Sequence, residues 1–266
     1  MITKKDIDCG TPFDWGKTSR DYAKYRDIYP TEFYQKILDL GLCKDGQCVL
    51  DIGTGTGVLP RNMYSYGARW TGTDISENQI TQARLLAKEA NYDIDFFTCP
   101  AEELVYPENT FDVITACQCI WYLNHKTLAP AFSKMLKPGG KFLILYMAWL
   151  PYEDRIAGES ERIILNYNPN WTGAGEIRKP MWVPEEYQAF FDITSREVFD
   201  VMVPFTRESW HGRIRACRGV GASLSESDLR KWDFEHKKML EQTAPEAFEV
   251  LHFVTYAELT VKRGSV

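Results

Sequence analysis

The sequence has no long apolar run and no excess of positive charge. No apolar stretch in its 266 residues approaches the length that crosses a membrane, about 20 residues. Its first residues, MITKKD, lack the apolar core of a signal peptide. The formal net charge is −6 at pH 7, whereas tight non-specific binding of nucleic acid needs a basic surface. We therefore expect a cytoplasmic protein without a membrane partner, for which nucleic acid is not the expected ligand unless a local basic patch exists.

Patterns for metal ligands, disulfides and general bases are also missing. The seven cysteines are scattered and odd in number, and Cys117 and Cys119 are too close together for a zinc knuckle. This usage indicates reduced thiols and no metal site. No carboxylate lies in a recognisable catalytic motif, and His125 and His211 offer only weak candidates for a base. His125 could face a ligand crevice, but flanking the following helix is the interpretation that we favour. The catalytic residues therefore stay unassigned.

The strongest signal present is the stretch VLDIGTGTG, residues 49–57. Its apolar, partly β-branched start is typical of a strand buried in a parallel sheet. The glycines that follow suit a turn with positive φ, or a turn where a ligand approaches the backbone closely. A helical pattern begins at Val58, so the stretch predicts a nucleotide-type cradle at the first crossover of a doubly wound sheet. The residues assigned to this cradle are Asp51, Gly53, Thr54, Gly55 and Gly57.

The spacing of the glycines distinguishes between cofactors. A dinucleotide fingerprint requires a glycine at position 58, which is occupied by Val58. Asp74 ends the next expected strand, where an acid can accept both hydroxyls of a ribose. With this glycine motif, Asp74 and the Lys-Pro-Gly-Gly turn at 137–140, the chain resembles the class I S-adenosylmethionine-dependent methyltransferases. The resemblance implies S-adenosyl-L-methionine as cofactor. It also implies a Rossmann-like, doubly wound α/β fold whose seven-stranded, mostly parallel sheet has an antiparallel edge strand and an irregular cap insertion.

The resemblance implies further cofactor contacts beside these motifs. Ile75 follows the ribose-binding acid, and Gln118 and Cys119 end the fourth expected strand, near the position of the sulfonium. After the third strand, Pro100 stands where the family usually has an acid that meets the adenine amino group. Two alternatives remain for the contact with adenine, since either Glu102 takes it over or the backbone of Ala101 provides it. A plain solvated role for Glu102 stays open as well.

The segment before the first strand is similar to the N-terminal segment that covers the methionine end of the cofactor in relatives. By this resemblance Arg26 pairs with the cofactor carboxylate and Tyr22 packs beside it. A surface arginine on an N-terminal helix is the alternative. The resemblance thus implies one methyltransferase domain over residues 1–266 with a cofactor-covering segment at 1–30. The irregular, aromatic-rich pattern at 147–184 indicates a cap or lid, and the pattern at 204–245 indicates a helical C-terminal segment.

The acceptor side has no motif, although 14% of the residues are aromatic, which suits an enclosed pocket for a small organic substrate. The candidate substrate contacts are Trp121, Tyr122, Trp149 and Trp210. For Trp210 and its helix, packing on the sheet with solvated arginines is the alternative that we favour. We expect methyl transfer to a small molecule. A methyltransferase for tRNA or protein, or a non-catalytic protein that binds the cofactor, stays possible, with a nicotinamide oxidoreductase as the outside option. The oligomeric state is undetermined.

Overall fold

The computed structural model describes residues 2–262, so Met1 and residues 263–266 of the predicted domain lie outside the described residues. The chain divides into two compact units. The sheet unit consists of residues 31–147, 179–199 and 254–262, and the helical unit consists of residues 2–30, 148–178 and 200–253. Most of the N-terminal, cap and C-terminal segments singled out from the sequence therefore belong to the helical unit.

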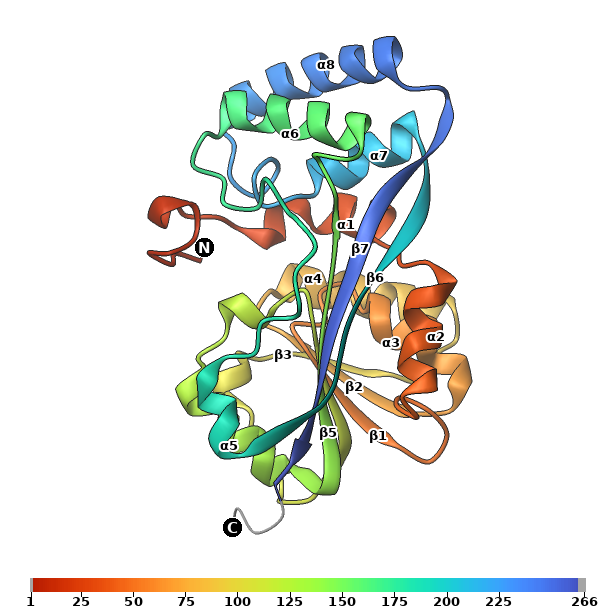
Figure 1. Ribbon diagram of the computed structural model, residues 1–266, viewed down its shortest axis with the longest axis vertical. Helices are drawn as coiled ribbons and strands as arrows, with labels where there is room; N and C mark the ends of the chain where they lie inside the picture. Colours follow the sequence, from red (N-terminus) through yellow and green to blue (C-terminus); the bar gives the residue numbers. More distant parts are fainter. Residues whose placement is uncertain (1, 263–266) are drawn as a thin grey trace. The chain divides into compact units, whose positions relative to one another are not determined.

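One seven-stranded sheet has the strand order β3-β2-β1-β4-β5-β7-β6 (Figure 1). Strands β1 to β5 pair in parallel, with Val49 opposite Trp70 of β2 and Val113 of β4. The β7 arrow points against its neighbour β5, so the sheet is mixed and its antiparallel part lies toward the β6 edge (Figure 1). The predicted fold class is confirmed. The strands are β1 (Cys48–Ile52), β2 (Arg69–Asp74), β3 (Asp95–Thr98), β4 (Phe111–Cys117), β5 (Leu136–Trp149), β6 (Phe191–Thr206) and β7 (Ala247–Val261).

The helices of the sheet unit cover the two faces of the sheet. The α-helices are α2 (Thr31–Asp39), α3 (Val58–Met63), α4 (Glu77–Glu89) and α5 (His125–Met135), and α2 and α3 lie on the opposite side of the sheet from α5 (Figure 1). Because helices cover it, β1 has a buried apolar run with Val49, Leu50 and Ile52 all at most 1% exposed. Short 3-10 helices connect the elements at η3 (Tyr64–Tyr66), η4 (Ala101–Glu103), η5 (Ile120–Tyr122) and η6 (Glu185–Ala189).

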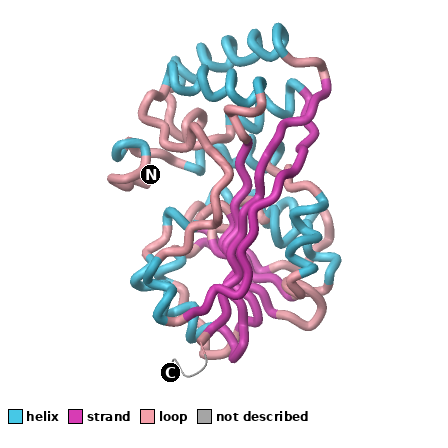
Figure 2. The backbone as a smooth tube through the Cα atoms, viewed as in Figure 1, coloured by secondary structure: helices cyan, strands magenta, loops and turns pink. Residues whose placement is uncertain are grey.

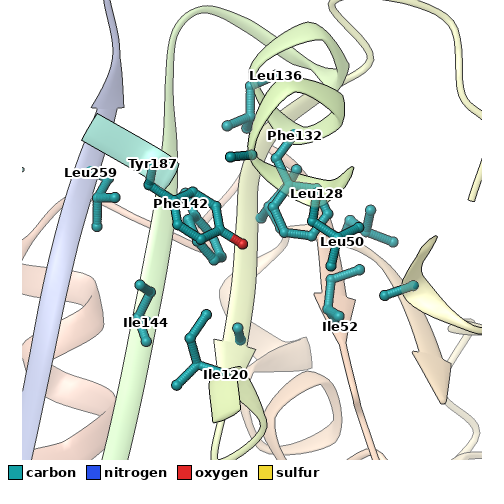
Figure 3. Close-up of a cluster of buried hydrophobic side chains, with 14 of the residues drawn as sticks. Leu50, Ile52, Ile120, Leu128, Phe132, Leu136, Phe142, Ile144, Tyr187 and Leu259 are labelled. Atoms are coloured by element: carbon teal, nitrogen blue, oxygen red, sulfur yellow. The ribbon is translucent and has the colours of Figure 1, made fainter. Parts of the chain in front are cut away.

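A core cluster of the sheet unit lies between α5 and the sheet (Figure 3). Phe132 of α5 meets Phe142 of β5 with ring centroids 5.2 Å apart, and Tyr187 of η6 lies 5.1 Å from Phe142. Each such fully buried aromatic or aliphatic side chain contributes about 1.5–3 kcal/mol relative to exposure. This packing holds β4 and β5 in place, and with them the strand ends that carry candidate site residues.

The described residues of the helical unit form four α-helices, which are α1 (Ser19–Tyr25), α6 (Arg155–Tyr167), α7 (Arg207–Arg215) and α8 (Glu226–Thr243). Figure 2 draws all helices of the chain in cyan. It also contains η1 (Asp8–Gly10) and η2 (Trp15–Thr18). Within the cap segment 147–184, the prediction of irregular structure is wrong for α6. Asp154 caps this helix by accepting a hydrogen bond from the Ala157 amide at 3.0 Å, and Ile163 and Ile164 are fully buried. The sequence of α6 itself has a helical pattern of buried residues, but the glycines, prolines and aromatic residues on both sides of it favoured a prediction of irregular structure.

Helices α1 and α7 approach each other closely because α7 contains Gly212. A Cβ at this position would lie 2.2 Å from Cδ2 of Tyr25, so no larger residue fits without a shift. Next to Gly212, Trp210 is fully buried and Arg213 is only 4% exposed. The expectation of solvated arginines on this helix is therefore wrong for Arg213.

Candidate functional site

The glycine turn after β1 adopts the left-handed backbone that its sequence predicts. Gly53, Gly55 and Gly57 have φ of 62°, 56° and 73°, and Gly57 is the N-cap of α3. A Cβ on Gly53 would lie 2.8 Å from Cβ of Cys119, and a Cβ on Gly57 would lie 2.5 Å from Cζ of Phe96. Both backbone conformation and close approach therefore require glycine at these two positions.

Asp51 holds this turn from beneath. Its two carboxylate oxygens accept hydrogen bonds from the hydroxyls of Thr54 and Thr115, both at 2.6 Å, and the residue is 2% exposed. Burial raises the pKa of Asp51 to about 6, opposed by the two hydroxyl hydrogen bonds and assisted by the negative charge of Asp74. Asp51 thus joins the turn to β4, and this role is a structural one beneath the ligand cradle.

Asp74 joins the ends of β1 and β2. Its Oδ2 accepts from the amide of Gly55 at 3.0 Å, and its Oδ1 accepts from the amide of Ser76 at 2.9 Å. Burial raises the pKa of Asp74, while backbone hydrogen bonds from Ser76, Gly55 and Ile75 oppose the shift. An ionised carboxylate has about four lone-pair positions, so each oxygen can accept a further hydrogen bond from a ligand hydroxyl. Ile75 beside it is 58% exposed and offers an apolar surface next to the acid.

The end of β4 closes the cradle against β1 and β5. Gln118 has a positive φ of 66°, which is uncommon outside glycine, and its side-chain amide donates to the Met147 carbonyl at 2.7 Å. The thiol of Cys119 donates to the Ile52 carbonyl at 3.0 Å and packs where a side chain on Gly53 would stand. Burial raises the pKa of the Cys119 thiol well above its ordinary value, so this group stays neutral.

The adenine-side candidates lie in and beside η4. Ala101 is buried, and Glu102 is exposed with its Oε1 accepting from the amide of Asn124 at 2.8 Å. Asn124 is the N-cap of α5, and Trp121 in the preceding 3-10 helix packs edge to face on Tyr146 at 4.6 Å. Glu102 is therefore connected to the loop that also carries the candidate substrate contacts Trp121 and Tyr122.

His125 occupies the first turn of α5, as favoured from the sequence. Its ring lies between Trp182 at 5.5 Å and Tyr187 at 5.7 Å, measured between ring centroids. These contacts place the imidazole among aromatic side chains at the start of the helix.

The remaining candidates belong to the helical unit. Arg26 donates from Nη2 to the Tyr22 hydroxyl at 3.2 Å and stacks over the Tyr22 ring, 4.7 Å from its centroid. Trp149 donates from its indole to Glu161 at 2.5 Å, and the indole of Trp210 donates to Ser160 at 2.9 Å. Trp210 is fully buried, which favours the packing role over a substrate contact. Contacts of these four residues with a ligand stay predictions.

Two residues that hold the cradle were missed from the sequence. Thr115 binds Asp51 from β4, 64 positions along the chain, and no local signal reports this pairing. Gly72 in β2 was detectable, because an isolated glycine inside a strand often marks a close approach. A Cβ at Gly72 would lie 2.7 Å from Phe96 and 2.8 Å from the Thr54 hydroxyl. Phe96 therefore packs against two glycines, Gly57 and Gly72, and fixes the space between turn and sheet.

The donor set of the cradle fits a nucleoside cofactor. Close-approach glycines, the half-buried acid Asp74 and the exposed Ile75 lie together at the carboxyl ends of β1 and β2, where open α/β sheets bind ligands. The hydroxyls of Thr56 and Thr73 are buried here without a hydrogen-bond partner in the described structure. Over residues 2–262, no group of three or more His, Cys, Asp or Glu side chains is arranged to hold a metal ion. None of the described helices combines the length and apolar character of a membrane span.

Comparisons with known proteins give the same fold and identify its central part. Residues 50–144 match a family model described as a methyltransferase domain. A curated ubiquinone biosynthesis O-methyltransferase of Idiomarina loihiensis is 40% identical over 101 residues, which cover 36% of this chain and 40% of the relative. An enzyme of the same name from Pseudomonas entomophila is 28% identical over 71% of this chain and 80% of the relative. The chain spans 40% of the first relative and about half, 54%, of two others.

A solved structure shows the shared fold over most of the chain. Phosphoethanolamine N-methyltransferase 2 of Haemonchus contortus, in complex with phosphomonomethylethanolamine and S-adenosylhomocysteine, matches with a TM-score of 0.52 at 21% identity. The match covers 90% of this chain and 57% of that chain.

Proposed function

Because residues 50–144 match a family model described as a methyltransferase domain, we propose that this protein transfers a methyl group from S-adenosyl-L-methionine to a small organic molecule. The observation that carries the proposal is the pairing of Asp74 with the glycine turn. Its carboxylate accepts the Gly55 amide at 3.0 Å, which holds the acid beside the backbone that a nucleoside must approach. The matching relatives are named as O- and N-methyltransferases, which supports transfer to oxygen or nitrogen without choosing between them.

Each cradle residue has a defined part in cofactor binding. Asp74 accepts the two ribose hydroxyls through the lone pairs that its backbone hydrogen bonds leave available. Ile75, which is 58% exposed, supplies an apolar surface for the adenine, and the backbone at Ala101 or the carboxylate of Glu102 meets the adenine edge. Gly53 permits the close approach of the cofactor to the turn. In the helical unit, Arg26 pairs with the cofactor carboxylate and Tyr22 packs beside it.

The protein contributes orientation more than acid–base chemistry. When bound, S-adenosyl-L-methionine supplies an electrophilic methyl group on a sulfonium, ready for in-line displacement. The chain's own residues position the acceptor and exclude water, and such positioning can supply about 7–11 kcal/mol of rate acceleration. Cys119 stays a neutral thiol because burial raises its pKa, and both oxygens of Asp51 are engaged by hydroxyls. Neither group is assigned as a base, and we assign no other.

A small acceptor in the cytoplasm fits the composition. The net charge of −6 does not favour tRNA, and the scattered, odd set of seven cysteines suits a reducing compartment. Trp121 and Tyr122 in η5, which follows β4, would provide aromatic surface for an apolar acceptor.

Calorimetric titration tests the cofactor assignment directly. The wild-type protein should bind S-adenosylhomocysteine and not NADH, whereas binding of NADH without S-adenosylhomocysteine would overturn the proposal. Asp74→Ala should weaken binding of S-adenosylhomocysteine, while Asp93→Ala, an exposed acid of the same unit, should leave it unchanged. Transfer of labelled methyl to a metabolite extract then tests catalysis. Binding of S-adenosylhomocysteine without transfer to any small molecule would instead support a binding protein.

A further inference from the structure

Arg213 is a buried cation for which the described part of the chain, residues 2–262, provides no acidic partner. It lies on α7 and is 4% exposed. Its Nη1 donates to the thiol of Cys217 at 3.0 Å, and its guanidinium carbon lies 5.0 Å from the ring centroid of Trp149. Its Nε is buried without any hydrogen-bond partner among the described residues. Neither Cys217 nor Trp149 supplies a carboxylate, although a buried charge is costly unless it is paired.

A second guanidinium adds to the same positive charge. Arg26 follows Tyr25, whose ring packs against Gly212, the residue before Arg213. Burial lowers the pKa of Arg213, and the charge of Arg26 lowers it further. Arg26, which is half-buried, contacts the ring and the hydroxyl of Tyr22. Neither Arg26 nor Arg213 has an ion pair with an acid among residues 2–262.

Other arginines of the same unit do form ion pairs with acids. Arg215, two positions after Arg213, forms ion pairs with Asp21 and Asp233. Arg218 forms a two-pronged ion pair with Asp8, which is itself fully buried. Arg215 and Arg218 thus have carboxylate partners, whereas none of the described carboxylates pairs with Arg213.

His252 offers an acceptor in the same interior. Its Nδ1 lies 2.9 Å from the Val250 carbonyl, which can only accept, so Nδ1 carries the proton. Its Nε2 is then an acceptor, and it is buried without a partner in the part of the chain that the structure describes. Burial lowers the pKa of His252 to about 3, and the charges of Arg213 and Arg26 contribute, so the ring stays neutral. The Trp149 ring connects the two groups, since its centroid lies 5.0 Å from the Arg213 guanidinium carbon and 6.4 Å from the centroid of the His252 ring.

We propose that Arg213 binds the carboxylate of an organic acid, and that this acid is the methyl acceptor. The second half of the proposal rests on the proposed methyltransferase function. A guanidinium matches a carboxylate through its planar fork, and the Trp149 ring offers an aromatic surface for the apolar body of the acid.

Thermal-shift and calorimetric measurements on the full chain test the site without knowledge of the true acceptor. Benzoate is the probe, benzamide its neutral isostere, and inorganic phosphate a second anion. Benzoate should raise the melting temperature of the wild-type protein and benzamide should not. Arg213→Met should weaken benzoate binding at least tenfold, while Arg213→Lys should retain part of it because the charge remains. Arg230→Met removes an arginine on α8 whose side chain is 72% exposed, and it should change nothing.

The titration of S-adenosylhomocysteine separates the two sources of a carboxylate. If Arg213→Met loses benzoate binding but keeps the affinity for S-adenosylhomocysteine within about twofold, the anion belongs to the acceptor. If the affinity for S-adenosylhomocysteine falls tenfold and benzoate does not bind the wild-type protein, the anion is the cofactor's and the proposal is overturned. Equal effects of benzoate and benzamide on the wild-type protein, or binding of phosphate alone, would overturn it as well. The wild-type comparisons hold even if Arg213→Met does not fold.

The site and the proposed function can fail separately. Benzoate binding at Arg213 in a protein that does not bind S-adenosylhomocysteine would retain the anion site and remove the methyltransferase. Binding of S-adenosylhomocysteine with methyl transfer only to neutral acceptors would retain the methyltransferase and remove the acidic acceptor.

Discussion

The buried carboxylate of Asp51 should make the stability of this protein decrease as the pH rises through the mildly acidic range. Its pKa in the folded protein is raised to about 6 from an ordinary value of 3.8, mainly by burial. Between these two values the folded state binds more protons than the unfolded state, so folding is favoured at the acidic end and the advantage is lost as the pH rises through 6. Asp51→Asn removes the ionisation while keeping the shape and an acceptor for one of the two threonine hydroxyls.

The size of the effect follows from the shift. One pKa unit corresponds to 1.36 kcal/mol, so ionisation of Asp51 in the folded protein costs about 3 kcal/mol of unfolding free energy at neutral pH. About 2 kcal/mol of this cost develops between pH 4.5 and 7.5. Because Asp51 is 2% exposed, screening by solvent reduces the figure little.

Urea unfolding at several pH values measures the effect. The free energy of unfolding of the wild-type protein should fall by about 2 kcal/mol more than that of Asp51→Asn between pH 4.5 and 7.5. The comparison cancels the other acids, which both proteins share. Thr115→Val, which removes a hydrogen bond that lowers the pKa of Asp51, should enlarge the decrease. Parallel pH profiles for wild-type protein and Asp51→Asn would refute the argument that burial dominates at this carboxylate.

Two further substitutions test the cradle. Asp74→Ala should weaken S-adenosylhomocysteine by at least about 2 kcal/mol in calorimetry, since a charged acceptor of two ribose hydroxyls is lost, and an unchanged dissociation constant would remove Asp74 from the site. Gly57→Ala should destabilise the protein by about 1–3 kcal/mol in urea unfolding, because φ is 73° and the new Cβ would lie 2.5 Å from Phe96. Phe96→Leu in the Gly57→Ala background should recover part of this loss, and no recovery would show that backbone strain alone is responsible.

The cradle could be predicted from the sequence because its information is local. Gly53, Gly55 and Gly57 report positive φ by their identity, and Asp74 is located by the alternation of strand and helix. The parallel pairing of β1 with β2 and β4 follows once those strands are recognised. In each case a residue type has one main physical reason to stand where it does, so the pattern is specific.

The features that were missed depend on partners far away in the chain. Thr115 binds Asp51 across 64 positions, and nothing around Thr115 distinguishes it from an ordinary strand threonine. Arg213 appeared to belong to a solvated helix face, because its burial depends on the approach of α1 over Gly212. Helix α6 was hidden by neighbouring glycines and aromatic residues, whose roles depend on tertiary packing: Trp171, for example, fills the space beside Gly173 and Gly219.

This difference between local and distant information bears on where the acceptor is recognised. The family match, residues 50–144, lies wholly within the sheet unit, which carries the cradle. The helical unit is assembled from three separate pieces of chain. Some of its ion pairs join different pieces, as Asp8 does with Arg218 and Asp21 with Arg215. Among the described residues no acid pairs with Arg213, and its Nε has no hydrogen-bond partner. Many enzymes bind the same cofactor, so a sequence motif that they share can bind it. The methyl acceptor differs from enzyme to enzyme, so the residues that bind it differ as well. The unpaired charge therefore lies in the part of the molecule where an acceptor-specific feature is expected, and the charge of the acceptor is the property that it predicts.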